Sequence, residues 1–111
     1  MPDDTGAEQK HTAALSAFTS DGYTLGANDD GATNVNQSGK SYVGWLWDAG
    51  SSTVSNTDGS ITSNVRANQT AGFSIVSFNA GSSGNKTVGH GLNADLGMFI
   101  IKDRDNPGAW Q

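Results

Sequence analysis

Hydrophobic and polar positions alternate most clearly over residues 73–78, FSIVSF, where Phe73, Ile75 and Phe78 are interspersed with serines. A period of two is typical of a strand with one buried face. We therefore predict a strand here, with Phe73 and Ile75 in the core.

Two further hydrophobic runs predict strands of a different kind. Residues 98–101, MFII, form a continuous hydrophobic run, which is typical of a strand that is buried on both faces, and we expect Ile100 in the core. Residues 41–47, SYVGWLW, place hydrophobic side chains on both faces of an extended chain. Such a strand belongs in the middle of a sandwich or against another chain.

The remaining chain gives weaker signals. Residues 23–25, YTL, follow a turn at residues 20–22 and read as a short strand, and residues 61–65 read as an edge strand. Alanine-rich residues 11–18 predict one or two helical turns. Residues 49–56 are rich in small polar residues and predict a linker.

Composition favours an all-β fold. The chain has 111 residues, of which 34% are hydrophobic, only 15% are charged and 15 are glycine. A chain of this length is one domain's worth of material, and short strands joined by polar turns suit its composition. Composition therefore predicts an all-β fold.

Charge and cysteine content exclude several functions. The formal net charge is −5 and the lysines and arginines are scattered, so the sequence has no basic stripe for a phosphate backbone, and we expect no nucleic-acid partner. The chain has no cysteine, which excludes disulfides, zinc knuckles and thiol nucleophiles. No hydrophobic run approaches the roughly 18 residues of a membrane span, and we expect no membrane insertion.

Candidate chemistry is sparse. His90 lies between Gly89 and Gly91, where a flexible backbone can present an imidazole as a base or ligand, but a single histidine in a tight turn more often bonds a local carbonyl. Asp29 and Asp30 offer hard oxygen ligands for calcium, but their loop lacks the alternating order of an EF-hand, and a solvated loop is the favoured interpretation. We expect no catalytic residue, no cofactor and no enzymatic activity.

Aromatic residues are the best binding candidates. Aromatic faces stack on sugar rings and fill protein interfaces, which makes Tyr42, Trp45, Trp47 and Trp110 candidates for ligand or interface contacts. A core position is the favoured interpretation for Trp45 and Trp47, because a mostly polar chain needs them there. Trp110, near the end of the sequence, is freer to make contacts.

Five segments together carry a resemblance to a known kind of domain: DGYTLG at 21–26, VNQSGKSYVGWLWDAG at 35–50, SNTDGSITSNVRANQTAGFSIVSF at 55–78, TVGHGL at 87–92 and MFIIKDRDNPGAW at 98–110. In this set the chain resembles an uncharacterised β-sandwich repeat domain of tail-fibre-like and other virion structural proteins of marine bacteriophages. That domain often lies beside laminin-G or concanavalin-like domains. The resemblance implies a small antiparallel β-sandwich of the jelly-roll or concanavalin-like kind and a role in a virus particle, and it implies no catalytic or ligand residues.

The order of these segments implies a division of the chain. Residues 1–11 are expected to be a solvated arm, 12–50 a C-terminal-type half of a sandwich unit, 51–70 a Gly/Ser/Asn-rich linker or edge strand, and 71–111 an N-terminal-type half. The whole is expected to act as one domain. The two halves complement each other within the chain, or strands from neighbouring chains complete them.

The expected function is structural. We expect a component of a bacteriophage particle, such as a tail-fibre, spike or decoration module, that acts in assembly and in attachment to the host surface. We expect it in the virion or the extracellular space. Its expected partners are copies of itself, most simply in a trimer, or other virion proteins. The alternative is a carbohydrate-binding module that recognises a host or algal glycan.

Overall fold

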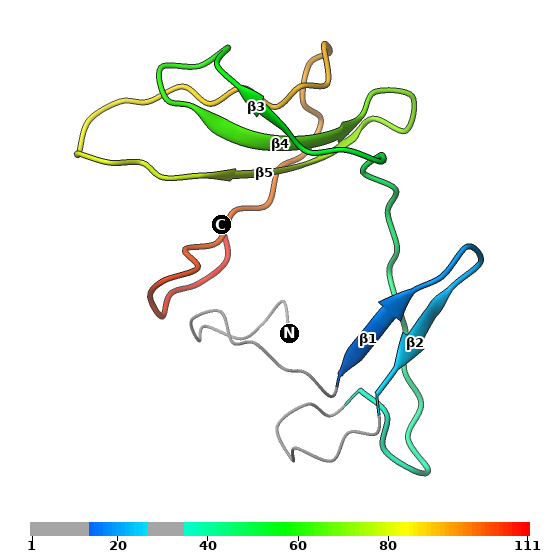
Figure 1. The fold of residues 1–111 in the computed structure, drawn as a ribbon. Helices are drawn as coiled ribbons and strands as arrows, with labels where there is room; N and C mark the ends of the chain where they lie inside the picture. The colour runs from blue at the N-terminus through cyan, green and yellow to red at the C-terminus, as the bar shows by residue number, and fades with distance from the viewer. Residues whose placement is uncertain (1–13, 27–34) are drawn as a thin grey trace. The chain divides into compact units, whose positions relative to one another are not determined.

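The computed structural model describes residues 14–26 and 35–111, and these contain strands but no helix (Figure 1). No helix that could cross a membrane is therefore found in the part of the chain that is described. Two compact units are distinguished, one from residues 1–44 and 99–111 and one from residues 45–98. The predicted all-β class is confirmed.

The first unit contains a hairpin of β1 (Leu15–Phe18) and β2 (Tyr23–Leu25). The strands are antiparallel, and a bulge between Leu15 and Ala17 shifts their register. The turn predicted at residues 20–22 is present, closed by a hydrogen bond from Thr19 N to Gly22 O of 2.9 Å.

The predicted helical turns over 11–18 are wrong where the chain is described, because Leu15–Phe18 is a strand. A helix this short is marginal by itself, and pairing with β2 satisfies the backbone of β1 instead. The predicted strand over 23–25 is confirmed as β2.

The second unit contains an antiparallel sheet of β3 (Val54–Asn56), β4 (Ser63–Asn68) and β5 (Phe73–Phe78), in that order (Figure 1). The strand predicted over 73–78 is confirmed. The linker predicted over 49–56 is wrong at its end, where β3 begins, and the edge strand predicted over 61–65 is instead the central β4, which starts at Ser63.

A four-residue loop joins β4 to β5. Asn68 Oδ1 accepts a hydrogen bond of 3.0 Å from Ala71 N, and Gly72 has a φ of 67°. An asparagine that bonds the backbone and a glycine at positive φ are the residues such a turn requires.

The core lies on one face of this sheet. Val65, 1% exposed, pairs with Val54 on one side and with Val76 on the other, so the three valines share a face. Ser63 lies on the same face, is also buried, and its Oγ donates a hydrogen bond of 3.2 Å to Gly89 O. The segment around Gly89 therefore covers this face.

The core positions predicted for Ile75 and Ile100 are wrong. Phe73 and Ile75 point to the opposite face from Val76; Phe73 is half-buried, and Ile75 is 56% exposed. Ile100 is 62% exposed. The alternation in FSIVSF was compatible with either face, and the covering segment determines which one is buried.

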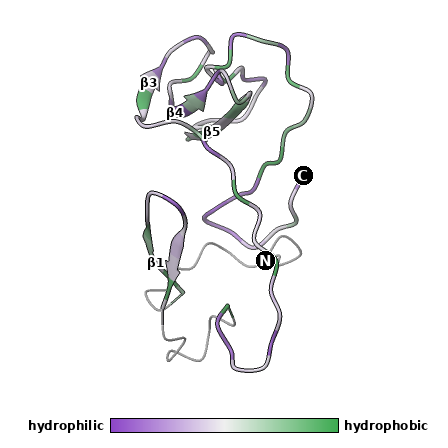
Figure 2. Cartoon of the chain, turned by 90° about the vertical axis from the view of Figure 1, so that its right-hand side faces the viewer, coloured by the Kyte–Doolittle hydropathy of each residue, from purple (hydrophilic) through white to green (hydrophobic). Residues whose placement is uncertain are grey.

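The strands predicted over 41–47 and 98–101 are absent, and both segments are exposed along their length. Strand propensity describes a fit to a pleated, half-buried surface, so it produces a strand only where a partner pairs with the backbone. Figure 2 shows hydrophobic stretches along parts of the chain that are not drawn as arrows.

Candidate functional site

The segment at residues 87–92, TVGHGL, is held to the β3–β4 connection by a reciprocal pair of hydrogen bonds. Ser60 N donates to Thr87 Oγ1 at 2.8 Å, and Thr87 N donates to Ser60 Oγ at 2.9 Å. Ile61 and Val88 form a parallel bridge beside this pair. A further bond of 3.0 Å runs from Gln69 Nε2 to Gly91 O at the other end of the segment.

The glycines of this region permit close backbone contact. A Cβ added at Gly59 would lie 2.2 Å from Thr87 O, and one at Gly89 would lie 1.8 Å from Asn56 Oδ1. Gly91 has a φ of 71°, and a Cβ there would lie 2.9 Å from Val65 Cγ1. Glycines at these positions let the segment lie directly on the sheet and cover Val65.

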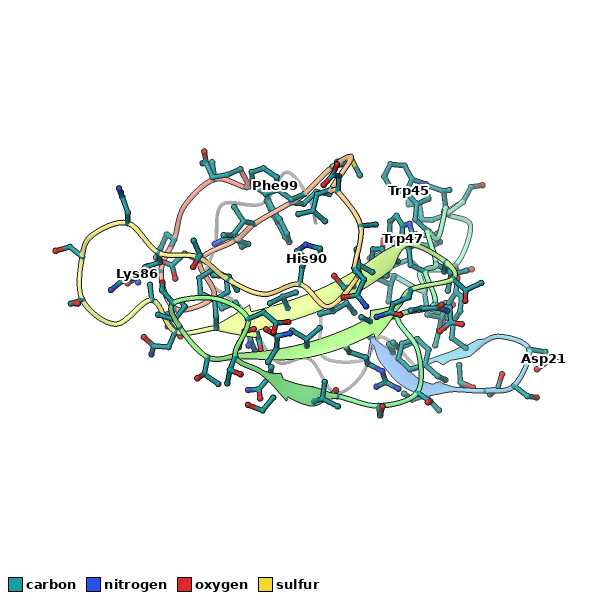
Figure 3. All side chains as sticks on the ribbon, turned by 90° about the horizontal axis from the view of Figure 1, so that it is seen from above. Asp21, Trp45, Trp47, Lys86, His90 and Phe99 are labelled. Atoms are coloured by element: carbon teal, nitrogen blue, oxygen red, sulfur yellow. The ribbon has the colours of Figure 1, made fainter. Side chains whose placement is uncertain are left out.

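The His90 side chain forms a hydrogen bond within this turn. Its Nδ1 accepts a hydrogen bond of 3.3 Å from Leu92 N, so the imidazole bonds the local backbone, but the predicted carbonyl partner is wrong because the partner is an N–H. Figure 3 labels His90, on the segment that crosses the sheet.

A shallow hollow of about 250 Å³ lies beside His90. It is lined by Asp58, Val88, Gly89, His90, Gly91, Asn93 and Ala94. The carboxylate of Asp58 accepts a hydrogen bond of 2.8 Å from Asn56 Nδ2. The two titratable side chains of the hollow are thus both engaged in local hydrogen bonds.

An aromatic cluster, formed by Trp45, Trp47 and Phe73, is the most distinctive surface feature. Trp47 stacks on Phe73 with ring centroids 5.5 Å apart and an interplanar angle of 11°, and Trp45 meets Trp47 edge-on at 6.4 Å. Trp45 is 73% exposed and Trp47 is 59% exposed. The core position favoured for both tryptophans is therefore wrong in this chain, and Figure 3 shows the two side chains next to each other.

The segment Asp48–Ala49–Gly50 holds Trp47 against the sheet. Asn68 Nδ2 donates a hydrogen bond of 3.0 Å to Asp48 Oδ2, and Arg66 Nε donates one of 2.7 Å to Gly50 O. Ala49 is 7% exposed. Because Arg66 pairs with Ile75 and Asn68 pairs with Phe73, these polar groups lie on the same face of the sheet as the aromatic cluster.

This anchoring was missed in the sequence. The sequence feature that could have indicated it is Asp48-Ala49-Gly50, directly after the aromatic run. In the structure Asp48 Oδ1 accepts a hydrogen bond of 2.7 Å from Gly50 N, and Gly50 has a φ of 85°. Aspartate and glycine at this spacing are typical of a turn that bonds its own backbone.

The other aromatic candidates lie in the first unit. The Tyr42 hydroxyl accepts a hydrogen bond of 3.0 Å from Gln37 N, and its ring is half exposed. Trp110 is 43% exposed and precedes Gln111, which exchanges two backbone hydrogen bonds of 3.0 Å with Ile101. The calcium candidates Asp29 and Asp30 lie outside the described residues.

Residues 102–106 form a hydrogen-bonded loop. Asp103 Oδ1 accepts hydrogen bonds from Asp105 N at 2.9 Å and Asn106 N at 3.3 Å, and its Oδ2 accepts one from Asn106 Nδ2 at 3.1 Å. The bond from Asp105 N, and then that from the Asn106 side chain, lowers the pKa of Asp103 below its ordinary value of 3.8. Within residues 14–26 and 35–111, no three His, Cys, Asp or Glu side chains are grouped as a metal would require.

Comparison with curated proteins gives no match, and comparison with solved structures gives none either. The family model described as "Domain of unknown function (DUF7483)" matches residues 1–111. With a match over this whole range, the chain belongs to the DUF7483 family.

Proposed function

We propose that this domain is a structural module on the exterior of a bacteriophage particle, in a tail fibre, spike or decoration protein. It works by assembling with copies of itself or with other virion proteins, and it also acts in attachment to the host surface. The bacteriophage setting is supported by the resemblance of the five sequence segments. The assembly role is supported by the distribution of hydrophobic side chains.

That distribution is the observation that carries the proposal. Among the described residues, Ala49 and Val65 are the hydrophobic side chains that are buried, whereas nineteen large hydrophobic side chains are exposed. Covering hydrophobic surface is favourable by about 25 cal/mol per Å². Trp45 and Trp47 are in contact within this set, and contiguous exposed hydrophobic side chains mark contacts with other proteins.

The proposed assembly also accounts for the sandwich that the resemblance implies. In a jelly-roll or concanavalin-like sandwich, two sheets pack face to face about 10 Å apart. The face that carries Phe73 and Ile75 is partly covered by the Trp47–Gly50 segment, and Ile75 remains exposed. A strand layer from a neighbouring chain would cover Ile75 and complete the sandwich.

Particle composition tests the biological setting. Phage particles released from a host that carries this sequence would be purified on a density gradient and digested for mass spectrometry. We expect peptides of this domain to sediment with the major capsid and tail proteins and to be removed by protease treatment of intact particles. Peptides found only in the lysate supernatant would refute the proposal.

The aromatic cluster favours carbohydrate binding as a second function. Trp45 presents an exposed indole edge-on to Trp47, and Asp48, which follows Trp47 in the chain, accepts a hydrogen bond from Asn68. Exposed aromatic rings together with polar groups are what a sugar ring needs from a protein. A glycan array with the wild type and Trp45→Ala tests it, with Trp110→Ala as the matched control. Binding that only Trp45→Ala abolishes is expected; absence of binding by the folded wild type removes this function.

A further inference from the structure

The free edge of β5 differs from the other strand edges in the described part of the chain. β5 spans six residues, Phe73–Phe78, and pairs with β4 on one side. Its sequence, FSIVSF, contains no charge, no proline and no glycine. The backbone N–H and C=O groups on its other side are a template for a further strand.

The other edges carry devices that prevent pairing. β3 and β2 are three residues long, and β1 contains a bulge. Short length, bulges and charge are the means by which proteins protect sheet edges, and β5 has none of them.

We propose that β5 pairs antiparallel with β5 of a second copy of this chain, so that two three-stranded sheets join into one of six strands. The pairing rests on the assembly proposed above. It identifies a second copy as one partner and adds an edge-to-edge contact through β5 to the face-to-face contact of the sandwich. A closed two-fold contact of this type uses the same surface of both copies.

Symmetry restricts the register. A two-fold axis that relates two antiparallel copies of one strand is perpendicular to the sheet, so each face of one copy continues as the same face of the other. Two residues that lie opposite each other must therefore both have odd numbers or both have even numbers. If the axis passes through Ile75, residues 73–77 of one strand lie opposite residues 77–73 of the other. If it passes through Val76, residues 74–78 are paired in the same way, and an axis through any other residue pairs fewer residues.

Exposure favours the centre at Ile75. The Ile75 side chain is 56% exposed, and a second Ile75 directly opposite would cover it. Val76 points to the face that the segment around Gly89 already covers, so a pairing centred on Val76 gains less. The face with Phe73 and Ile75 would then continue across both copies.

Cysteine crosslinking tests the pairing in the full chain, which contains no natural cysteine. Opposite residues of antiparallel strands have Cα atoms about 4.5–5.5 Å apart, which is within the range of a disulfide. Under mild oxidation we expect Ile75→Cys to form a covalent dimer, while Ser55→Cys, on the exposed strand β3, stays monomeric on a non-reducing gel. A disulfide at Val76→Cys but not at Ile75→Cys would overturn the Ile75-centred pairing.

Charge variants give an independent test, because Ile75 is exposed and the substitutions leave the core intact. Ile75→Lys alone and Ile75→Glu alone should each have the mass of one chain, since like charges face each other across the pair. Mixing the two should restore twice the 11.4 kDa of one chain. Ser55→Lys, the control, should keep the wild-type mass.

Failure of the pairing and failure of the assembly have different signatures. A multimeric wild type that Ile75→Lys leaves multimeric would overturn the strand pairing alone. A wild type with the mass of one chain at high concentration would overturn the assembly and the pairing together.

Discussion

Val65 is the most buried hydrophobic side chain of the described residues, and replacing it with alanine tests where the core lies. Val65 is 1% exposed on the central strand β4, and Val54, directly opposite on β3, is 57% exposed. The two valines share a face and a cross-strand pair. Val54→Ala is therefore a matched control for Val65→Ala.

The magnitude follows from burial. Val65→Ala removes two methylene equivalents, which costs about 1.6 kcal/mol at ~0.8 kcal/mol each. The cavity left under the Gly89 segment adds a further term of about 1 kcal/mol when the site cannot collapse. We therefore expect a loss of about 2–3 kcal/mol in the free energy of unfolding. Because Val54 has less than half of its surface covered, its replacement should cost roughly 0.7 kcal/mol.

Urea unfolding followed by far-ultraviolet circular dichroism measures both costs. The chain concentration must be held constant, because assembly makes the apparent stability depend on it. Val65→Ala should lower the transition midpoint several times more than Val54→Ala, with unchanged slopes. Equal shifts for the two variants would contradict the core described here.

Two further predictions concern backbone contact and titration. Gly59→Ala should destabilise the domain by about 1–3 kcal/mol, because the added Cβ would collide with Thr87 O. The control, Gly97→Ala, has no atom within 4 Å of the added Cβ and should change the stability by less than about 0.5 kcal/mol. Equal shifts of the melting temperature for the two variants would refute the close contact at Gly59. Since the folded pKa of Asp103 lies below 3.8, its hydrogen bonds stabilise the loop above that pH and are lost as the pH falls through the lower folded value. The side-chain carboxyl carbon of Asp103 should therefore titrate with a midpoint below pH 3.8 in a nuclear magnetic resonance series, whereas a midpoint at or above 3.8 would contradict the hydrogen bonds.

Strands with local support could be predicted from the sequence. β2 follows a Ser-Asp-Gly turn, and β5 follows a Gly at positive φ, so turn chemistry and alternation agree in both. The boundaries of both strands match the residues that the pattern indicated.

Strands that depend on distant partners could not be predicted. β4, SNVRAN, has little hydrophobic character of its own and forms because β3 and β5 pair with it on both sides. Residues 41–47 have the opposite character: strong strand propensity and no strand partner in the part of the chain described. Pairing is a property of the whole sheet, which the local pattern does not contain.

The residues that meet in the candidate site likewise depend on contacts between distant parts of the chain. The sequence identified Trp45 and Trp47 as binding candidates, but Phe73 joins them only because β5 places it under Trp47. The buried face of β5 could not be assigned either, since it depends on Gly89 and Gly91 lying over Val65.

Sedimentation equilibrium of the purified wild-type chain over a range of concentrations tests the central claim, that neighbouring chains cover the exposed hydrophobic residues. We expect a mass of at least twice the 11.4 kDa of one chain, and this mass should fall toward that of one chain on dilution. A folded chain that keeps the mass of a single copy at every concentration would contradict it.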